Sequence, residues 1–147
     1  MSYITNADVE TRLGTSVYVQ LTDDTGTGSA DVAVVDEARL GAEGEANSYL
    51  GRRYAVPVDL ALHPELGDVL GRFVLDLAAY RLHARRPPVP PDVVRQREAA
   101  IAWFERVASG AVTLPALTAL AENTATGTVG EVSGDPRVLT RDALKDL

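Results

Sequence analysis

The chain has 147 residues, of which 46% are hydrophobic and 24% charged, so one globular domain can bury a core without disulfides or metals. It contains no cysteine, which excludes disulfide frameworks, thiol nucleophiles and cysteine-bound metal centres. The net charge of −7 argues against a surface that binds nucleic-acid phosphates. The sequence shows neither a signal peptide nor a membrane-spanning apolar run, so we expect a protein made in a cytoplasm with no membrane partner.

Two short helices and a loop are predicted at the start of the chain. Thr5 or Asn6 can cap a helix that runs through residue 13 and ends at Gly14. Residues 17–21 alternate too briefly to distinguish a helical turn from a strand, and we favour a helix. Residues 22–29 combine Asp, Thr and Gly, which favour local backbone hydrogen bonds, so we expect an exposed loop there.

Residues 31–50 have apolar positions at steps of three and four, which predicts an amphipathic helix that ends at Gly51. Gly41 and Gly44 lie inside this helix, where each costs about 1 kcal/mol relative to alanine. Their presence indicates that another backbone approaches closely at these positions. Residues 52–58 then form an extended linker, because Pro57 cannot continue a helix.

Two further helices are predicted after the linker. One begins at Pro64, carries a broad apolar stripe and ends at Arg85-Arg86-Pro87-Pro88, where the two cations complement the helix dipole. The other begins at Pro91 and ends at Gly110. The chain is therefore predicted to be all-α, a small bundle of about four helices formed by residues 1–110.

The composition changes after Gly110, since residues 121–136 are mainly Thr, Gly, Asn, Ser and acids with few apolar side chains to bury. We expect residues 111–147 to form an extended C-terminal arm. Thr140 can cap a short amphipathic segment at its end, which exposes four apolar side chains: Leu139, Ala143, Leu144 and Leu147. Such a segment needs a surface on which to dock.

The loop after residue 22 partly imitates a calcium-binding loop. Asp23, Thr25, Thr27 and Gly28 occupy the first, third, fifth and sixth places of an EF-hand. The twelfth place holds Val34 instead of the bidentate glutamate, so the pattern favours an ordinary or partner-binding loop.

Catalytic patterns are weak elsewhere. His63 and His83 have no metal-ligand spacing around them, and no serine lies in a Gly-x-Ser-x-Gly elbow. Glu43 with Asp36 or Glu37 could be imagined as magnesium ligands, but charge runs on a helix usually form a solvated face. We expect no enzyme activity, no cofactor and no metal.

Several short motifs follow one another in order along nearly the whole chain. They are Tyr3-Ile4-Thr5-Asn6-Ala7-Asp8, Gln20-Leu21-Thr22-Asp23, Tyr49-Leu50-Gly51-Arg52-Arg53-Tyr54, Tyr80-Arg81-Leu82, Trp103-Phe104 and Asp135-Pro136-Arg137-Val138-Leu139-Thr140-Arg141-Asp142-Ala143-Leu144. In this order and spacing they resemble the small head proteins of Mu-like tailed bacteriophages, a family related in design to head–tail connector (adaptor) proteins. One departure is Leu139, where we expect an aromatic residue.

The resemblance implies a noncatalytic virion component at the head–tail interface, made in the host bacterial cytoplasm. Its subunits would form a ring, expected to be dodecameric, between the portal protein and the tail-completion (stopper) proteins. The ring would line the channel through which phage DNA passes, and an acidic lumen would let the DNA pass without specific binding because such binding needs cations.

The resemblance also implies two contact regions. The arm would bind the portal or a neighbouring subunit through Arg137, Val138, Leu139, Arg141, Leu144 and Leu147. The loop would face another ring through Asp23, Asp24, Thr25 and Thr27.

Other functions remain open at this stage. A tail terminator or minor capsid protein would have the same kind of compact body with an arm. A DNA-binding packaging partner would need a basic patch, and a small metal-dependent nuclease would need carboxylates that converge on a metal.

Overall fold

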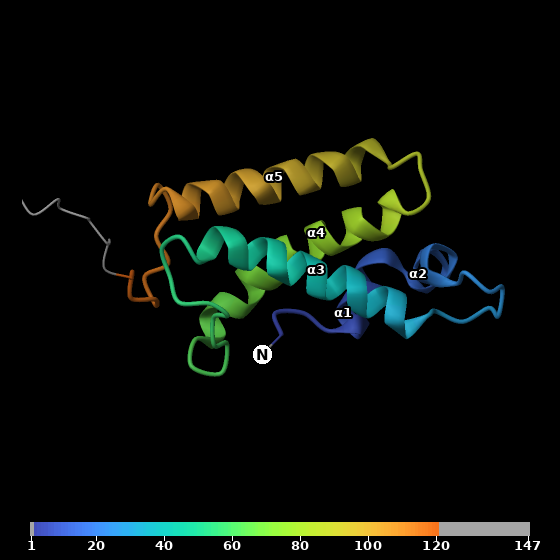
Figure 1. Ribbon diagram of the computed structural model, residues 1–147, viewed down its shortest axis with the longest axis horizontal. Helices are drawn as coiled ribbons and strands as arrows, with labels where there is room; N and C mark the ends of the chain where they lie inside the picture. The colour runs from blue at the N-terminus through green and yellow to red at the C-terminus, as the bar shows by residue number, and fades with distance from the viewer. Residues whose placement is uncertain (1, 121–147) are drawn as a thin grey trace, which may run out of the picture.

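The computed structural model describes residues 2–120, in which all of the regular structure is helical (Figure 1). The elements in chain order are α1 (Asn6–Leu13), α2 (Thr15–Thr22), α3 (Val32–Leu50), the 3₁₀ turn η1 (Pro64–Leu66), α4 (Gly67–Ala84) and α5 (Pro91–Ala108). The predicted all-α class is confirmed. The described part has five α-helices where about four were expected, because the short helix at residues 15–22 is a separate element.

The helix ends follow from local sequence. Thr5 and Asp8 form a reciprocal capping box at the start of α1, and Gly14 ends that helix with a φ of 80°. Asp31 caps α3 by accepting a hydrogen bond from the amide of Ala33. Proline occupies the first turn of both η1 and α5, where a missing amide hydrogen costs nothing.

Helix α4 lies at the centre of the bundle and packs against α1, α3 and α5. The long helices α3 and α5 run beside it, while α1 and α2 gather at one end (Figure 1). The side chain of Phe104 on α5 is fully buried, and its ring lies 6.1 Å from Tyr49, 6.1 Å from Phe73 and 5.1 Å from Trp103 between centroids. This aromatic cluster joins α3, α4 and α5 into one core.

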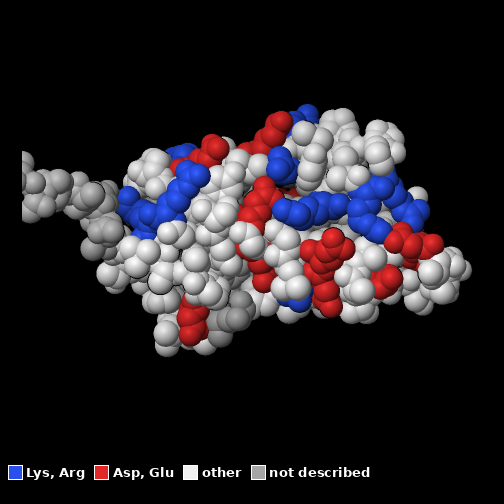
Figure 2. Space-filling view, viewed as in Figure 1, with Lys and Arg blue, Asp and Glu red and all other residues white. Residues whose placement is uncertain are grey.

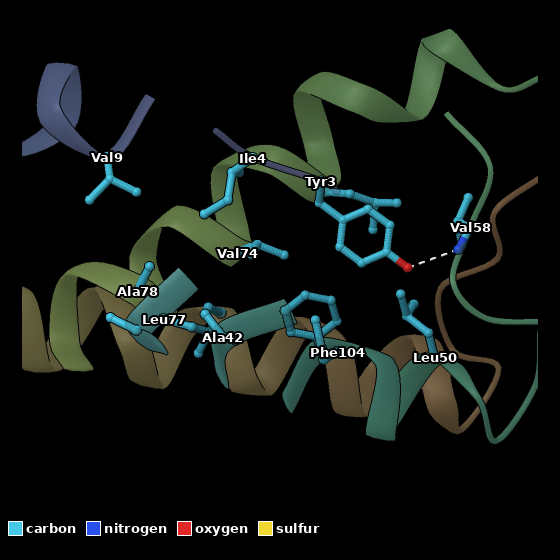
Figure 3. Packing of buried hydrophobic residues seen from close by; sticks show 14 of the residues in the cluster. Tyr3, Ile4, Val9, Ala42, Leu50, Val58, Val74, Leu77, Ala78 and Phe104 are labelled. Carbon is cyan, nitrogen blue, oxygen red and sulfur yellow. Dashed lines mark hydrogen bonds between the residues drawn. The ribbon is translucent and has the colours of Figure 1, made fainter. Parts of the chain in front are cut away.

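The N-terminal segment is held by buried polar contacts (Figure 3). The hydroxyl of Tyr3 accepts a hydrogen bond of 2.8 Å from the amide of Val58 and donates one of 2.5 Å to Asn47. Glu43, which is only 8% exposed, accepts a hydrogen bond of 3.0 Å from the Tyr3 amide. Burial raises the pKa of the Tyr3 hydroxyl. The first residues and the α3–η1 linker therefore close one side of the core together.

The expected backbone approach at Gly41 and Gly44 is wrong for the described residues. A side chain at Gly41 would meet the guanidinium of Arg81, with Nη1 2.9 Å from the added carbon. A side chain at Gly44 would meet nothing within 4 Å. Gly41 thus gives room to a long side chain, and the packing of residues 2–120 does not explain the glycine at position 44.

Candidate interaction surfaces

The loop between α2 and α3, residues 23–31, is organised by one carboxylate. Asp23 Oδ1 accepts hydrogen bonds from the amides of Thr25, Gly26 and Thr27 at 3.2, 2.8 and 3.1 Å, and Oδ2 accepts one from Gly28 at 2.7 Å. The amides of Gly28 and Thr27 contribute most to holding the pKa of Asp23 below its ordinary value. The carboxylate that would begin a calcium site therefore binds backbone amides.

A second carboxylate ties the same loop to the end of α4. Asp24 accepts a hydrogen bond of 2.5 Å from Arg85 and one of 3.2 Å from Arg86. Arg85 also donates to the carbonyl of Leu21 at 2.6 Å, and Arg86 donates to the carbonyl of Asp23 at 3.0 Å. The hydrogen bond from Arg85 is the main cause of the lowered pKa of Asp24. The two arginines, explained from sequence by the helix dipole alone, hold the loop in place.

These contacts divide the four predicted loop residues into two kinds. Asp23 and Asp24 shape and anchor the loop, whereas Thr25 and Thr27 are exposed and project from it. Their hydroxyls make at most long contacts with Asp23, of 3.5 and 3.4 Å. The contact of this loop with another protein stays a prediction, and the surface it offers runs from Asp24 to Ser29, all of which are exposed.

A groove that the sequence patterns did not reveal lies between α3, α4 and α5. It has a volume of about 420 Å³, and we call it the central groove. Its charged lining consists of Glu37 and Glu45 from α3, Arg81 from α4, Arg85 directly after α4, and Arg97 from α5. On the face shown in Figure 2, basic and acidic side chains accordingly lie next to one another.

Glu45 forms two ion pairs in the central groove. Its two oxygens pair with Arg81 at 2.9 Å and with Arg97 at 3.3 Å. The guanidinium of Arg97 also lies 4.6 Å from the ring centroid of Tyr80. No sequence spacing signals these pairs, because Glu45 lies 36 residues before Arg81 and 52 before Arg97.

The first part of the predicted arm lies on the helical body. Leu114 is buried, and its amide donates a hydrogen bond of 3.0 Å to the hydroxyl of Tyr54. The amide of Leu120 donates one of 2.7 Å to the carbonyl of Arg53. Residues 111–120, which we call the arm root, are thus fixed beside the C-terminal end of α3. The arm residues predicted to bind a partner, Arg137, Val138, Leu139, Arg141, Leu144 and Leu147, lie outside the described residues, as does the segment capped by Thr140.

Two of the carboxylates considered as magnesium ligands, Asp36 and Glu43, both form an ion pair with Arg39, at 3.4 and 3.5 Å. Glu43 binds the N-terminal segment, and Asp36 accepts a hydrogen bond of 2.9 Å from Asn6. Within residues 2–120, no group of three or more histidine or acidic side chains converges as a metal site would require. His83 is half-buried, and burial lowers its pKa.

No helix in the described part of the chain has the length and hydropathy needed to span a membrane. Comparison with protein families matches residues 3–132 to the family model described as Bacteriophage Mu, Gp36. A search of curated proteins finds no match. The matched region covers most of the chain and includes the whole helical body, the loop and the arm root.

Proposed function

Because this chain belongs to the bacteriophage Mu Gp36 family, we propose that it is a structural virion protein that acts as a head–tail connector. The family that the sequence motifs indicated is thereby confirmed, and it identifies a phage protein of a head-related structural kind. In the proposed role the subunits form a ring, expected to be dodecameric, between the portal protein and the tail-completion proteins.

One observation supports this proposal: the α2–α3 loop and the arm root, which precedes the predicted arm contacts, lie at opposite ends of the bundle (Figure 1). The α2–α3 loop lies at one end of the longest axis, and the arm root lies at the other (Figure 1). A rigid subunit with contact regions at its two ends can join two neighbours stacked along one axis, as a connector must. A shell protein that contacts only lateral neighbours has no need of this arrangement.

Both ends are attached firmly to the body, which supports a connecting role. The loop is fixed by Asp24 with Arg85 and Arg86, and the arm root is fixed by Tyr54 and Arg53. Since the aromatic core joins the long helices, a load applied at one end reaches the other through packed side chains.

The charge distribution supports passage of DNA without specific binding. Residues 2–120 contain 11 arginines, of which six pair with carboxylates of the same molecule: Arg12, Arg39, Arg81, Arg85, Arg86 and Arg97. Paired guanidinium groups have less charge left for phosphates, and the chain as a whole is acidic. The proposed role needs no catalytic group or cofactor.

Native mass spectrometry of the chain mixed with the portal protein from its own gene cluster tests the proposal. We expect full-length subunits to add in a number that matches the portal ring. A protein that ends at Leu120 keeps the arm root and lacks only the rest of the arm, so we expect it to bind less. If neither protein binds the portal, the chain belongs elsewhere in the particle, as a tail terminator or a minor capsid protein would.

A further inference from the structure

The central groove has charged sides of opposite sign. Glu37 and Glu45 belong to α3, whereas Arg81 and Arg97 belong to α4 and α5 and Arg85 follows the end of α4. Between them the groove is lined by small apolar side chains, among them Val34, Ala38 and Ala84. Within residues 2–120, Glu37 forms no ion pair, so part of the acidic side is available to a ligand. The groove therefore fits a segment with one apolar face, one acidic edge and one basic edge.

The last residues of this chain have that pattern when they are placed on a helix. Leu139, Ala143, Leu144 and Leu147 share one broad face. Asp142 and Asp146 follow one edge of that face, and Arg141 follows the other, while Lys145 lies on the opposite side of the helix. Arg81 and Arg97 each donate to Glu45 through Nη2, so the acidic edge can meet only the guanidinium nitrogens that these pairs leave open, while Arg141 can meet Glu37 of α3.

The chain between the arm root and this segment is long enough to reach the groove of the same molecule. Residues 121–136 comprise 16 residues, among them three glycines and three threonines, and a flexible chain of this length has an end-to-end distance of roughly 20–24 Å. The groove residues of α3 lie about 8–24 Å along the helix from its C-terminal end, where the arm root is fixed. A linker whose length matches the span gives the largest effective concentration.

We propose that residues 137–147 bind in the central groove of their own molecule. The apolar face covers Val34, Ala38 and Ala84, and Arg141 lies on the side of Glu37. Docking in this way shields the apolar face of the free subunit, and any partner that binds the arm competes with the groove for it. This inference concerns the free subunit and does not depend on the connector role.

The absence of natural cysteines allows a direct test with the full-length chain. The variant Ala84→Cys with Leu144→Cys places one thiol in the groove and one in the terminal segment. We expect mild oxidation to give a disulfide within one molecule, seen as a monomer with a lower mass and faster migration in a non-reducing gel. The matched control is Ala99→Cys with Leu144→Cys, because Ala99 is exposed on α5 outside the groove.

Equal disulfide formation in the two cysteine pairs would overturn the proposal. A disulfide-linked dimer would also overturn it, because it would place the segment in the groove of a second copy.

The charge assignment has its own test. Glu37→Arg should lower the yield of the groove disulfide about two- to fivefold, the size expected for one exposed ion pair, and Arg141→Glu in the same chain should restore it. If neither substitution changes the yield of the groove disulfide, the assigned orientation is refuted. Neither measurement requires the portal protein, so failure here and failure to bind the portal are separate results.

Discussion

Asp24 and Arg85, 61 residues apart in sequence, join the α2–α3 loop to the end of α4 through a hydrogen bond of 2.5 Å between Oδ2 and Nη2. The same guanidinium donates to the carbonyl of Leu21, so it binds the loop at two points. The loop conformation is consequently coupled to the central helix of the bundle.

Asp24→Asn should loosen this loop and alter its response to acid. The pKa of Asp24 is lowered mainly by Arg85, and a carboxylate with a lowered folded pKa stabilises the contact above the unfolded pKa. The unfolded pKa of Asp24 is 3.8, and the contact should be lost as the pH falls below this value and through the lower pKa of the folded protein. Hydrogen exchange of the loop amides should show an acid transition in the natural protein, to which Asp23 also contributes, and Asp24→Asn should leave only the part that Asp23 causes. Thr25→Ala, whose hydroxyl makes only a long contact, should keep the transition, and its loss in that control would refute the assignment.

Gly110→Ala and Gly44→Ala should change stability in opposite directions. Gly110 has a φ of 81°, and an added side chain would also overlap the guanidinium of Arg53, so alanine should cost at least about 1–2 kcal/mol. Gly44 lies in a helix with open space beside it, so alanine should stabilise the protein by about 0.5–1 kcal/mol. Urea unfolding of the two variants measures both effects. A loss of stability at position 44 would show that the exposed face of α3 contacts something in the full-length chain.

Phe104 should contribute more to the core than any exposed apolar side chain. Its side chain is fully buried among three aromatic rings, and Phe104→Leu should cost up to about 1.5 kcal/mol, whereas Phe104→Ala should cost about 3–5 kcal/mol. Leu40→Ala is the control, because Leu40 is 58% exposed and its loss should change the free energy of unfolding by no more than about 0.5 kcal/mol. Similar values for Phe104→Ala and Leu40→Ala would contradict this packing.

His83 should make the fold less stable as the pH falls below 6.5. Burial lowers the pKa of His83, so as the pH falls the unfolded chain binds a proton at a higher pH than the folded protein does. The free energy of unfolding therefore decreases between pH 6.5 and the lower folded pKa. Asp92 opposes this shift but contributes less than burial. His83→Gln should reduce the loss of stability over this pH window, measured by urea unfolding at several pH values. An unchanged loss of stability in His83→Gln would contradict this assignment.

The helices could be predicted from the sequence because their signals are local. The capping box of Thr5 with Asp8 and the prolines at positions 64 and 91 lie within a few residues of the helix ends that they determine. Residues 15–22 were harder, because two helical turns give too short an apolar pattern to separate a helix from a strand.

The interaction surfaces depended on contacts that no spacing encodes. Asp24 meets Arg85, and Glu45 meets Arg97, only after the helices have packed. The interpretation of Gly41 failed for the same reason, since a guanidinium from α4 and not a backbone occupies the space beside it. The loop, by contrast, could be predicted from its Asp, Thr and Gly residues. The sequence did not show that the carboxylates of Asp23 and Asp24 bind groups of the same molecule.

The most direct test of the connector role is an electron cryomicroscopy reconstruction of the neck of the phage particle. We expect a ring of this chain around the DNA channel directly below the portal. The ends of the bundle that carry the α2–α3 loop and the arm root should face different neighbours along the axis. A neck reconstruction without the chain, with copies found in the head shell instead, would contradict the proposed function.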